Sequence, residues 1–159
     1  VQAMPLPAPG ERLQYGPASP QYGELRLPAG AGPHPVVVMI HGGCWLSQFD
    51  LTYFSHLAAA LTQQGFATWS IEYRRIGDPD GGWPGTFLDD AERIDHLREL
   101  AASRPLDLAR VPTLGHSAGG QQTLWAAGPA DAHSRLSADH APPTPAAVRL
   151  SLFPIPPAT

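Results

Sequence analysis

Two segments in the first half of the chain are rich in β-branched and apolar residues. The first is Val36–Ile40, and the second extends over residues 66–73. A continuous apolar run such as the first is typical of a strand buried on both faces of a parallel sheet, and the second segment is predicted to be another buried strand. Shorter mixed segments at residues 12–15 and 22–28 predict a short strand and an edge strand that precede them.

Helical spacing follows each of the two buried runs. Asp50 is a candidate N-cap for a helix that ends at Gly65. A longer helix is predicted over Phe87–Ala102, where Thr86 and Asp89 have the spacing of a capping box. The alternation of strands and helices predicts an α/β fold with a mostly parallel sheet flanked by helices.

The second half begins with a short apolar run that leads directly into a glycine-rich motif. Val111–Leu114 is predicted to be a strand, although Pro112 within it would remove one ladder hydrogen bond. Gly115-His116-Ser117-Ala118-Gly119 comes next, followed by a predicted helix over residues 121–127. A last strand is predicted over residues 148–153, after a Pro/Ala-rich loop.

Length and composition favour one globular domain over residues 1–159, with a loose lead-in over residues 1–20. The chain is 43% hydrophobic and 15% charged, with a formal net charge of -4. This charge argues against a nucleic-acid partner, and no apolar run approaches the ~18 residues of a membrane span. Because no signal-peptide pattern is visible, we expect a cytoplasmic location. Cys44 is the only cysteine, which excludes a disulfide within the chain.

The motif around Ser117 matches Gly-x-Ser-x-Gly between a predicted strand and a predicted helix. In a nucleophile elbow a sharp strand-to-helix turn presents the serine hydroxyl above the sheet, and glycines are needed where a side chain would clash. A second signal is His41-Gly42-Gly43-Cys44-Trp45, directly after the first buried run. A glycine-rich turn there can direct backbone N–H groups at an oxyanion. The alternative for this segment is a tight turn with Trp45 in the core.

These motifs, together with Ile71-Glu72-Tyr73-Arg74-Arg75 and Asp107-x-x-Arg110-Val111, resemble the α/β-hydrolase superfamily. The chain is most similar to its esterase branch, which includes acetyl xylan/feruloyl esterase-like and arylformamidase-like members. The resemblance covers about residues 20–128. It implies an acyl-ester or amide hydrolase that uses neither a metal nor an organic cofactor.

By the same resemblance, Ser117 is the nucleophile, and the N–H groups of Gly43, Cys44 and Ala118 form the oxyanion hole. The substrate would be a small acyl ester, or an N-formyl or acyl amide, that reacts through an acyl-enzyme. Trp45 is a candidate for the wall of the substrate pocket.

The rest of the triad is expected in the order Ser, then Asp or Glu, then His. The acids and histidines after Ser117 are Asp131, His133, Asp139 and His140. They lie in the predicted loop before the last strand, where the family carries no triad member. The chain is therefore expected to be a hydrolase domain truncated after its nucleophile half. A non-catalytic remnant or binding module is the alternative, and the strand at 148–153 would be an open edge that allows self-association.

The remaining polar residues of the motifs are expected to be structural. His41 is expected to support its loop through hydrogen bonds, and His116 to pack or hydrogen-bond rather than act as a base. Glu72, Arg74 and Arg75 are expected to order the loop that follows their strand.

Overall fold

The computed structural model describes residues 4–127 of the 159-residue chain. The elements follow one another in this order: β1 (Glu11–Gln14), β2 (Tyr22–Arg26), β3 (His34–Ile40), the 3-10 helix η1 (Leu51–Phe54), α1 (Ser55–Gln63), β4 (Ala67–Ile71), α2 (Gly85–Ala101), β5 (Leu106–Asp107), β6 (Thr113–Gly115) and α3 (Ala118–Ala126).

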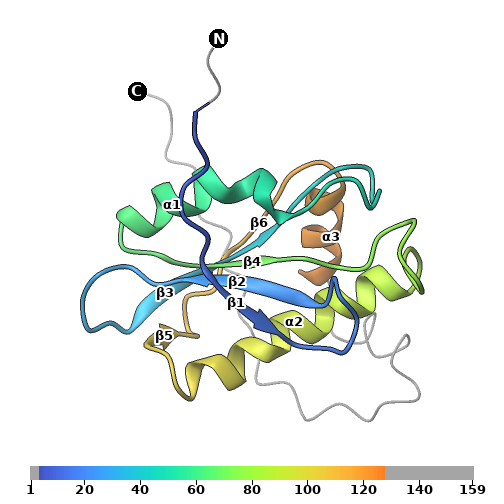
Figure 1. Cartoon of the computed structure of the whole chain (residues 1–159). Coiled ribbons are helices and arrows are strands. Elements are labelled where there is room, and N and C mark those ends of the chain that lie inside the picture. Colours follow the sequence, from blue (N-terminus) through green and yellow to red (C-terminus); the bar gives the residue numbers. More distant parts are fainter. Residues whose placement is uncertain (1–3, 128–159) are drawn as a thin grey trace, which may run out of the picture.

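One mixed sheet contains every strand (Figure 1). Strands β1, β2, β4 and β3 lie side by side in that order, and both β5 and β6 pair with β3. The pairs that β3 forms with β4, β5 and β6 are parallel, whereas β1 and β2 join the sheet in antiparallel fashion. The predicted α/β fold with a mostly parallel sheet flanked by helices is therefore confirmed.

Helices cover both faces of the sheet. On one face, Leu97 and Leu100 of α2 pack against alternate residues of β3 and β4, including the wholly buried Trp69. On the other face, Phe54 and Ala58 pack against Val37 and Met39 of β3. This arrangement explains why Val36–Ile40 contains no polar residue, since this part of β3 is buried on both sides.

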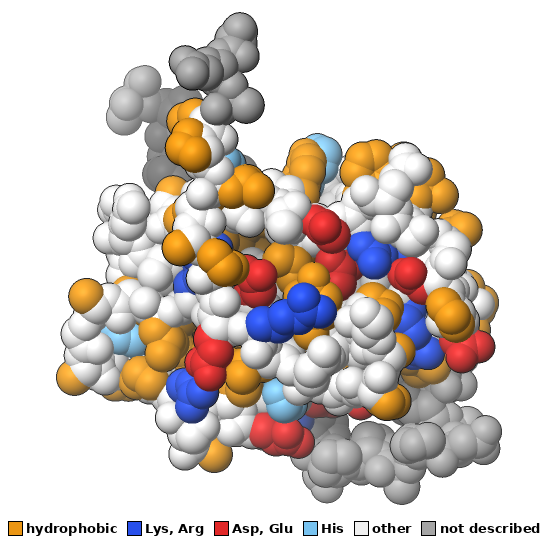
Figure 2. Space-filling model, viewed as in Figure 1, with side chains coloured by type: hydrophobic (Ala, Val, Ile, Leu, Met, Phe, Trp, Pro, Cys, Tyr) orange, Lys and Arg blue, Asp and Glu red, His pale blue; other side chains and the backbone are white. Residues whose placement is uncertain are grey.

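Helix α3 lies beside α2. The rings of Phe87 in α2 and Trp125 in α3 meet edge to face, with centroids 5.1 Å apart. Figure 2 shows that charged side chains of both signs are interspersed with apolar ones over one face of the molecule. Within the described part of the chain, no helix has the length and apolar character needed to cross a membrane.

Several sequence-based expectations about the elements were wrong. The strand at Tyr22–Arg26 is not at an edge, because β1 covers it. Helix α2 begins two residues before the predicted start, and its N-cap Pro84 makes no side-chain cap. Thr86 and Asp89 therefore form no capping box: the Thr86 hydroxyl donates to Arg74 O, and Asp89 accepts hydrogen bonds from Arg74.

The segment before the serine motif also differs from its prediction. Strand β6 begins at Thr113, so Pro112 lies just before the strand, where its carbonyl accepts a hydrogen bond from Val38 N at 3.0 Å. Asp107 ends the short strand β5 and pairs with Arg110 at 2.6 Å. The strand predicted at 148–153, and any self-association through it, lie outside the described residues.

Candidate functional site

Ser117 lies at a sharp turn between β6 and α3, as its motif predicts. It is the N-cap of α3, its backbone has φ 54° and ψ −118°, and it is exposed. A positive φ is costly for a residue with a Cβ, and it persists only where the surrounding structure enforces it. The turn therefore holds the serine in a strained backbone conformation at the carboxyl end of a sheet strand.

Close backbone packing enforces this turn. A Cβ on Gly119 would lie 2.0 Å from Ile40 O, and a Cβ on Gly115 would lie 2.2 Å from Gly119 O. No side chain fits in either space, so both positions require glycine. The first residues of α3 are thus pressed directly against the end of β3.

The loop that follows β3 lies against the serine turn. A Cβ on Gly42 would be 2.6 Å from His116 O and 3.1 Å from the Cβ of Ser117. The next three residues all have positive φ, at 120° for Gly43, 52° for Cys44 and 58° for Trp45. Two strained turns from segments about 75 residues apart therefore meet at one place.

Backbone donors are available in both turns. Within residues 4–127 the N–H groups of Gly43 and Cys44 donate to no acceptor. Ala118 is the first residue of α3, so its N–H has no carbonyl partner within the helix. The side chain of Cys44 is exposed, and the half-buried Trp45 packs against the core.

A buried ion pair lies beneath the loop after β3. Glu72 Oε1 is 3.0 Å from His41 Nε2 and 3.1 Å from Arg75 Nη1, and Glu72 Oε2 accepts from Leu51 N at 2.9 Å. His41 is 1% exposed and Glu72 is fully buried. Both residues directly follow paired strands, and their contact confirms that His41 supports its loop through hydrogen bonds.

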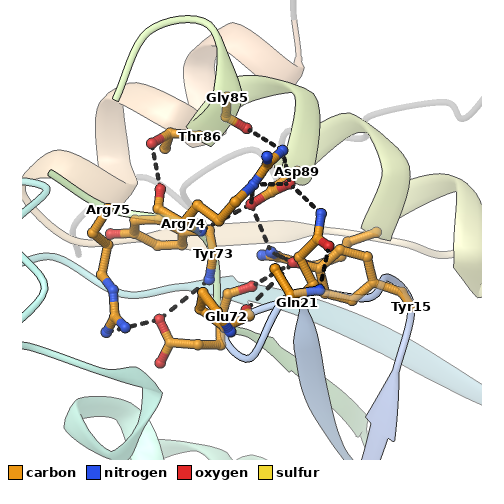
Figure 3. Close-up of polar contacts among 12 residues, drawn as sticks. Tyr15, Gln21, Glu72, Tyr73, Arg74, Arg75, Gly85, Thr86 and Asp89 are labelled. Carbon is orange, nitrogen blue, oxygen red and sulfur yellow. Dashed lines mark hydrogen bonds and ion pairs between the residues drawn. The ribbon is translucent and has the colours of Figure 1, made fainter. Parts of the chain in front are cut away.

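A second carboxylate holds the segment that leads into α2. Asp89 accepts from Arg74 through the backbone N at 2.8 Å and through the guanidinium Nη2 at 2.7 Å, and from Gln21 Nε2 at 2.9 Å (Figure 3). Burial raises the pKa of the Tyr15 hydroxyl, whose ring lies against Arg93. The expectation that Glu72, Arg74 and Arg75 order this loop is confirmed by these contacts.

The immediate neighbours of Ser117 include one aromatic pair. The exposed Tyr53 hydroxyl is 3.1 Å from His116 Nδ1, and the two rings stack with centroids 5.4 Å apart. In residues 4–127 the Ser117 hydroxyl forms no hydrogen bond with a histidine, and no group of three or more His, Cys, Asp or Glu side chains could hold a metal ion. The candidate residues Asp131, His133, Asp139 and His140 lie outside the described part.

Sequence reasoning missed Tyr53, Asp90 and Gln122. Tyr53 occupies an exposed position in a predicted helix, so nothing in the local pattern connects it with His116, 63 residues away. Asp90 and Gln122 are polar residues within predicted helices, yet both are fully buried. No local pattern marks either residue as buried, because each one hydrogen-bonds to a residue of a different helix.

Comparisons with known proteins agree with this architecture. The BD-FAE family matches residues 24–141, which is more than half of the chain. An uncharacterized 31.7 kDa protein of Escherichia coli from the traX-finO intergenic region is 30% identical over 105 residues, which are 65% of this chain and 36% of that protein. The chain thus spans about a third of the length of this relative.

Solved structures of esterases share the fold. Esterase B of Lactobacillus Rhamnosis (HN001) has a TM-score of 0.70 and 26% identity, covering 79% of this chain and 41% of that one. Esterase 2 of Thermogutta terrifontis has a TM-score of 0.65 at 21% identity, covering 72% and 44%. With the BD-FAE match over both turns, the chain belongs to the BD-FAE family of esterase-like α/β-hydrolases.

Proposed function

We propose that the protein is a serine hydrolase of the carboxylesterase type that acts on small acyl esters, or on N-formyl or acyl amides. The observation that carries this proposal is Ser117, exposed and at positive φ on a strand-to-helix turn, with the Gly42 backbone packed against it. The family and the similarity to esterase B support ester hydrolysis as the reaction. The proposal includes no metal or organic cofactor.

In this mechanism the Ser117 hydroxyl attacks the carbonyl carbon of the substrate. A serine hydroxyl needs a base to take its proton, and the base and its orienting acid would come from outside residues 4–127. The alcohol or amine leaves with that proton, which gives an acyl-enzyme. Water then attacks the acyl group and releases the acid together with free Ser117.

The charge that develops on the carbonyl oxygen would be held by the N–H groups of Gly43, Cys44 and Ala118. The first two face no acceptor among the described residues, and the third opens α3, where the helix dipole favours negative charge. Removing one such donor from an oxyanion hole typically slows turnover by about 10²–10³-fold. Trp45 lies in the same loop and would contribute its exposed part to the pocket wall.

Labelling with a fluorophosphonate probe tests the nucleophile. Purified protein is treated with the probe and read by intact mass, beside Ser117→Ala and the control Ser103→Ala, which removes an exposed serine. We expect one adduct on the unsubstituted protein and on the control, and none on Ser117→Ala. Labelling that survives in Ser117→Ala would refute Ser117 as the nucleophile.

The same experiment separates the alternative function. A folded protein that takes no label, and that hydrolyses no aryl ester, would favour a non-catalytic binding module on the hydrolase fold. The observation behind this alternative is that the Ser117 hydroxyl has no histidine partner within residues 4–127. Circular dichroism of the same samples establishes that the chain is folded in each case.

A further inference from the structure

The peptide unit between Gly42 and Gly43 has two opposite ends with different surroundings. Its carbonyl oxygen faces inward and lies 2.7 Å from His41 Nδ1. Its N–H belongs to Gly43 and is one of the donors proposed for the oxyanion. Because a trans peptide is planar and its C=O and N–H point in opposite directions, fixing the oxygen also fixes the direction of the N–H.

Glycines alone would not hold this peptide in one orientation. Gly42 and Gly43 have no side chains to restrict them, and glycine populates a wide range of φ and ψ. The loop nevertheless has a defined path, with φ 120° at Gly43. Packing of Gly42 against the Ser117 turn limits the path of this loop, and the His41 ring is the side chain that contacts the Gly42 carbonyl itself.

The His41 ring is itself held on each side. Nε2 lies 3.0 Å from Glu72 Oε1, and the ring stacks on Tyr73 with centroids 4.5 Å apart and an interplanar angle of 16°. The Tyr73 hydroxyl donates to His41 O at 2.8 Å. Since a carbonyl oxygen and a carboxylate oxygen only accept hydrogen bonds, the contacts with Gly42 and Glu72 require a hydrogen on Nδ1 and on Nε2.

Glu72 in turn is fixed by three further donors. Its carboxylate accepts from the N–H groups of Leu51 and Tyr73 at 2.9 and 3.2 Å, and it pairs with Arg75 at 3.1 Å. Figure 3 shows the carboxylate of Glu72 directed toward the guanidinium of Arg75. A fully buried carboxylate is costly unless it is paired and hydrogen-bonded, and these donors meet that condition.

We propose that His41 and Glu72 are positioning residues for the oxyanion hole: Glu72 holds the His41 ring, and His41 Nδ1–H holds the Gly42 carbonyl so that the Gly43 N–H points toward the substrate oxygen. The catalytic part of this inference rests on the proposed function of Ser117. The structural part does not, because the orientation of the Gly42–Gly43 peptide can be measured without any substrate.

Nuclear magnetic resonance of the ¹⁵N-labelled protein tests the structural part. Long-range ring correlations, assigned to His41 by their loss in His41→Phe, are expected to show a hydrogen on Nδ1. In Glu72→Gln the ring and the Gly43 amide signals are expected to shift together. The glutamine side chain places an N–H₂ group where the wild-type carboxylate oxygen accepts hydrogen bonds, so one set of donors loses its acceptor. A bare Nδ1, or a Gly43 amide unchanged in Glu72→Gln, overturns the proposal.

Asp89→Asn is the matched control. It also converts a fully buried, ion-paired carboxylate into an amide, but Asp89 contacts Arg74 and Gln21 rather than His41 or the loop after β3. We expect the His41 ring and the Gly43 amide to keep their signals in this variant. Comparable shifts in Asp89→Asn and Glu72→Gln would mean that any loss of buried charge disturbs the loop, and would overturn the specific role of Glu72.

Kinetics test the catalytic part. Rates of aryl-ester hydrolysis are divided by the concentration of Ser117 titrated with the fluorophosphonate probe, so that unfolded protein does not count. In Glu72→Gln and His41→Phe we expect kcat to fall between about 10-fold and 10³-fold, the upper figure being the loss of one donor, with KM little changed. Asp89→Asn is expected to keep its kcat. An unchanged kcat in Glu72→Gln overturns the positioning role.

The two proposals fail in different ways. If the unsubstituted protein neither labels nor turns over ester, the proposed function fails, while the resonance measurements still decide whether His41 and Glu72 orient the Gly43 amide. If labelling and turnover are normal but the Gly43 amide ignores Glu72→Gln, only the positioning role is overturned.

Discussion

Asp90 of α2 and Gln122 of α3 meet out of contact with water. One amide atom of Gln122 lies 2.7 Å from Asp90 Oδ2 and 3.1 Å from Oδ1, and both residues are fully buried. The contact is a hydrogen bond whether the amide nitrogen donates to a carboxylate or a protonated carboxyl donates to the amide oxygen. This polar pair links α3, the helix that follows Ser117, to its neighbour α2.

Burial, opposed by the nearby Arg93 and reinforced by Asp89, raises the pKa of Asp90 well above the 3.8 of an exposed aspartate. The folded state therefore keeps the proton over a pH range in which the unfolded chain has lost it. The stability that this group contributes is fully present below about pH 4 and is lost as the pH rises toward the folded-state pKa, by at most about 1.36 kcal/mol per pH unit.

Asp90→Asn tests this dependence. The amide is neutral at all pH values and retains a hydrogen bond to Gln122, so we expect its free energy of unfolding to exceed that of the unsubstituted protein increasingly as the pH rises from 5 to 8. Urea unfolding at four pH values measures the difference. A difference that does not change with pH would contradict the raised pKa.

Two adjacent glycines of α3 are expected to respond oppositely to alanine. A Cβ on Gly119 would lie 2.0 Å from Ile40 O, a backbone atom that cannot move aside, whereas a Cβ on Gly120 meets nothing nearer than Gly115 O at 3.6 Å. Gly119→Ala should lower the free energy of unfolding by about 1–3 kcal/mol or more. Gly120→Ala should raise it by up to about 1 kcal/mol, because alanine favours a helix.

Thermal and urea unfolding of both variants provide the measurement. Probe labelling of Ser117 adds a second readout, because Gly119 sets the distance between the turn and β3 while Gly120 does not contact β3. Equal losses of stability in the two variants would show that the close approach of Gly119 to Ile40 does not constrain the turn.

Buried and exposed carboxylates of α2 are expected to differ strongly in their contribution to stability. Asp89 is fully buried and accepts three hydrogen bonds or more from Arg74, whereas the side chain of Asp95 is 55% exposed in its pair with Arg98. Asp89→Asn should cost about 3–5 kcal/mol, since it removes the carboxylate that pairs with Arg74 and with the wholly buried Arg93. Asp95→Asn should cost less than about 1 kcal/mol. Urea unfolding of the two variants at pH 7 decides between this ranking and equal effects.

The parts of the fold that the sequence predicted are those with local causes. Val36–Ile40 is recognisable as a strand because both of its faces are covered by helices, and the turn at Ser117 because its glycines are required by close backbone packing. The register between β3 and β4 explains a further contact of the site. Ile40 pairs with Ile71, so His41 and Glu72 had to emerge side by side at the same edge of the sheet.

The polar face of α2 could not be predicted from spacing. The structure buries Asp89, Asp90 and Arg93 of this helix together with its apolar residues Phe87, Leu97 and Leu100. Each of the three charged residues meets a partner from a distant segment: Arg74, Gln122 and Tyr15 lie 15, 32 and 78 residues away along the chain. Local patterns do not reveal such pairs, because burial of a charge depends on a partner that only the folded chain supplies.

Replacing Ser117 by glycine rather than alanine should separate the strain of the turn from its chemistry. The residue has φ 54° and ψ −118°, a conformation that is costly for any side chain with a Cβ and accessible to glycine. Both variants lack the hydroxyl, so neither should take a fluorophosphonate label. We expect Ser117→Gly to be more stable than Ser117→Ala by about 1 kcal/mol or more, because only glycine relieves the strain while the neighbouring contacts of Gly115 and Gly119 stay in place. Urea unfolding measures the difference, and an alanine variant as stable as the glycine variant would show that the turn is not strained at Ser117.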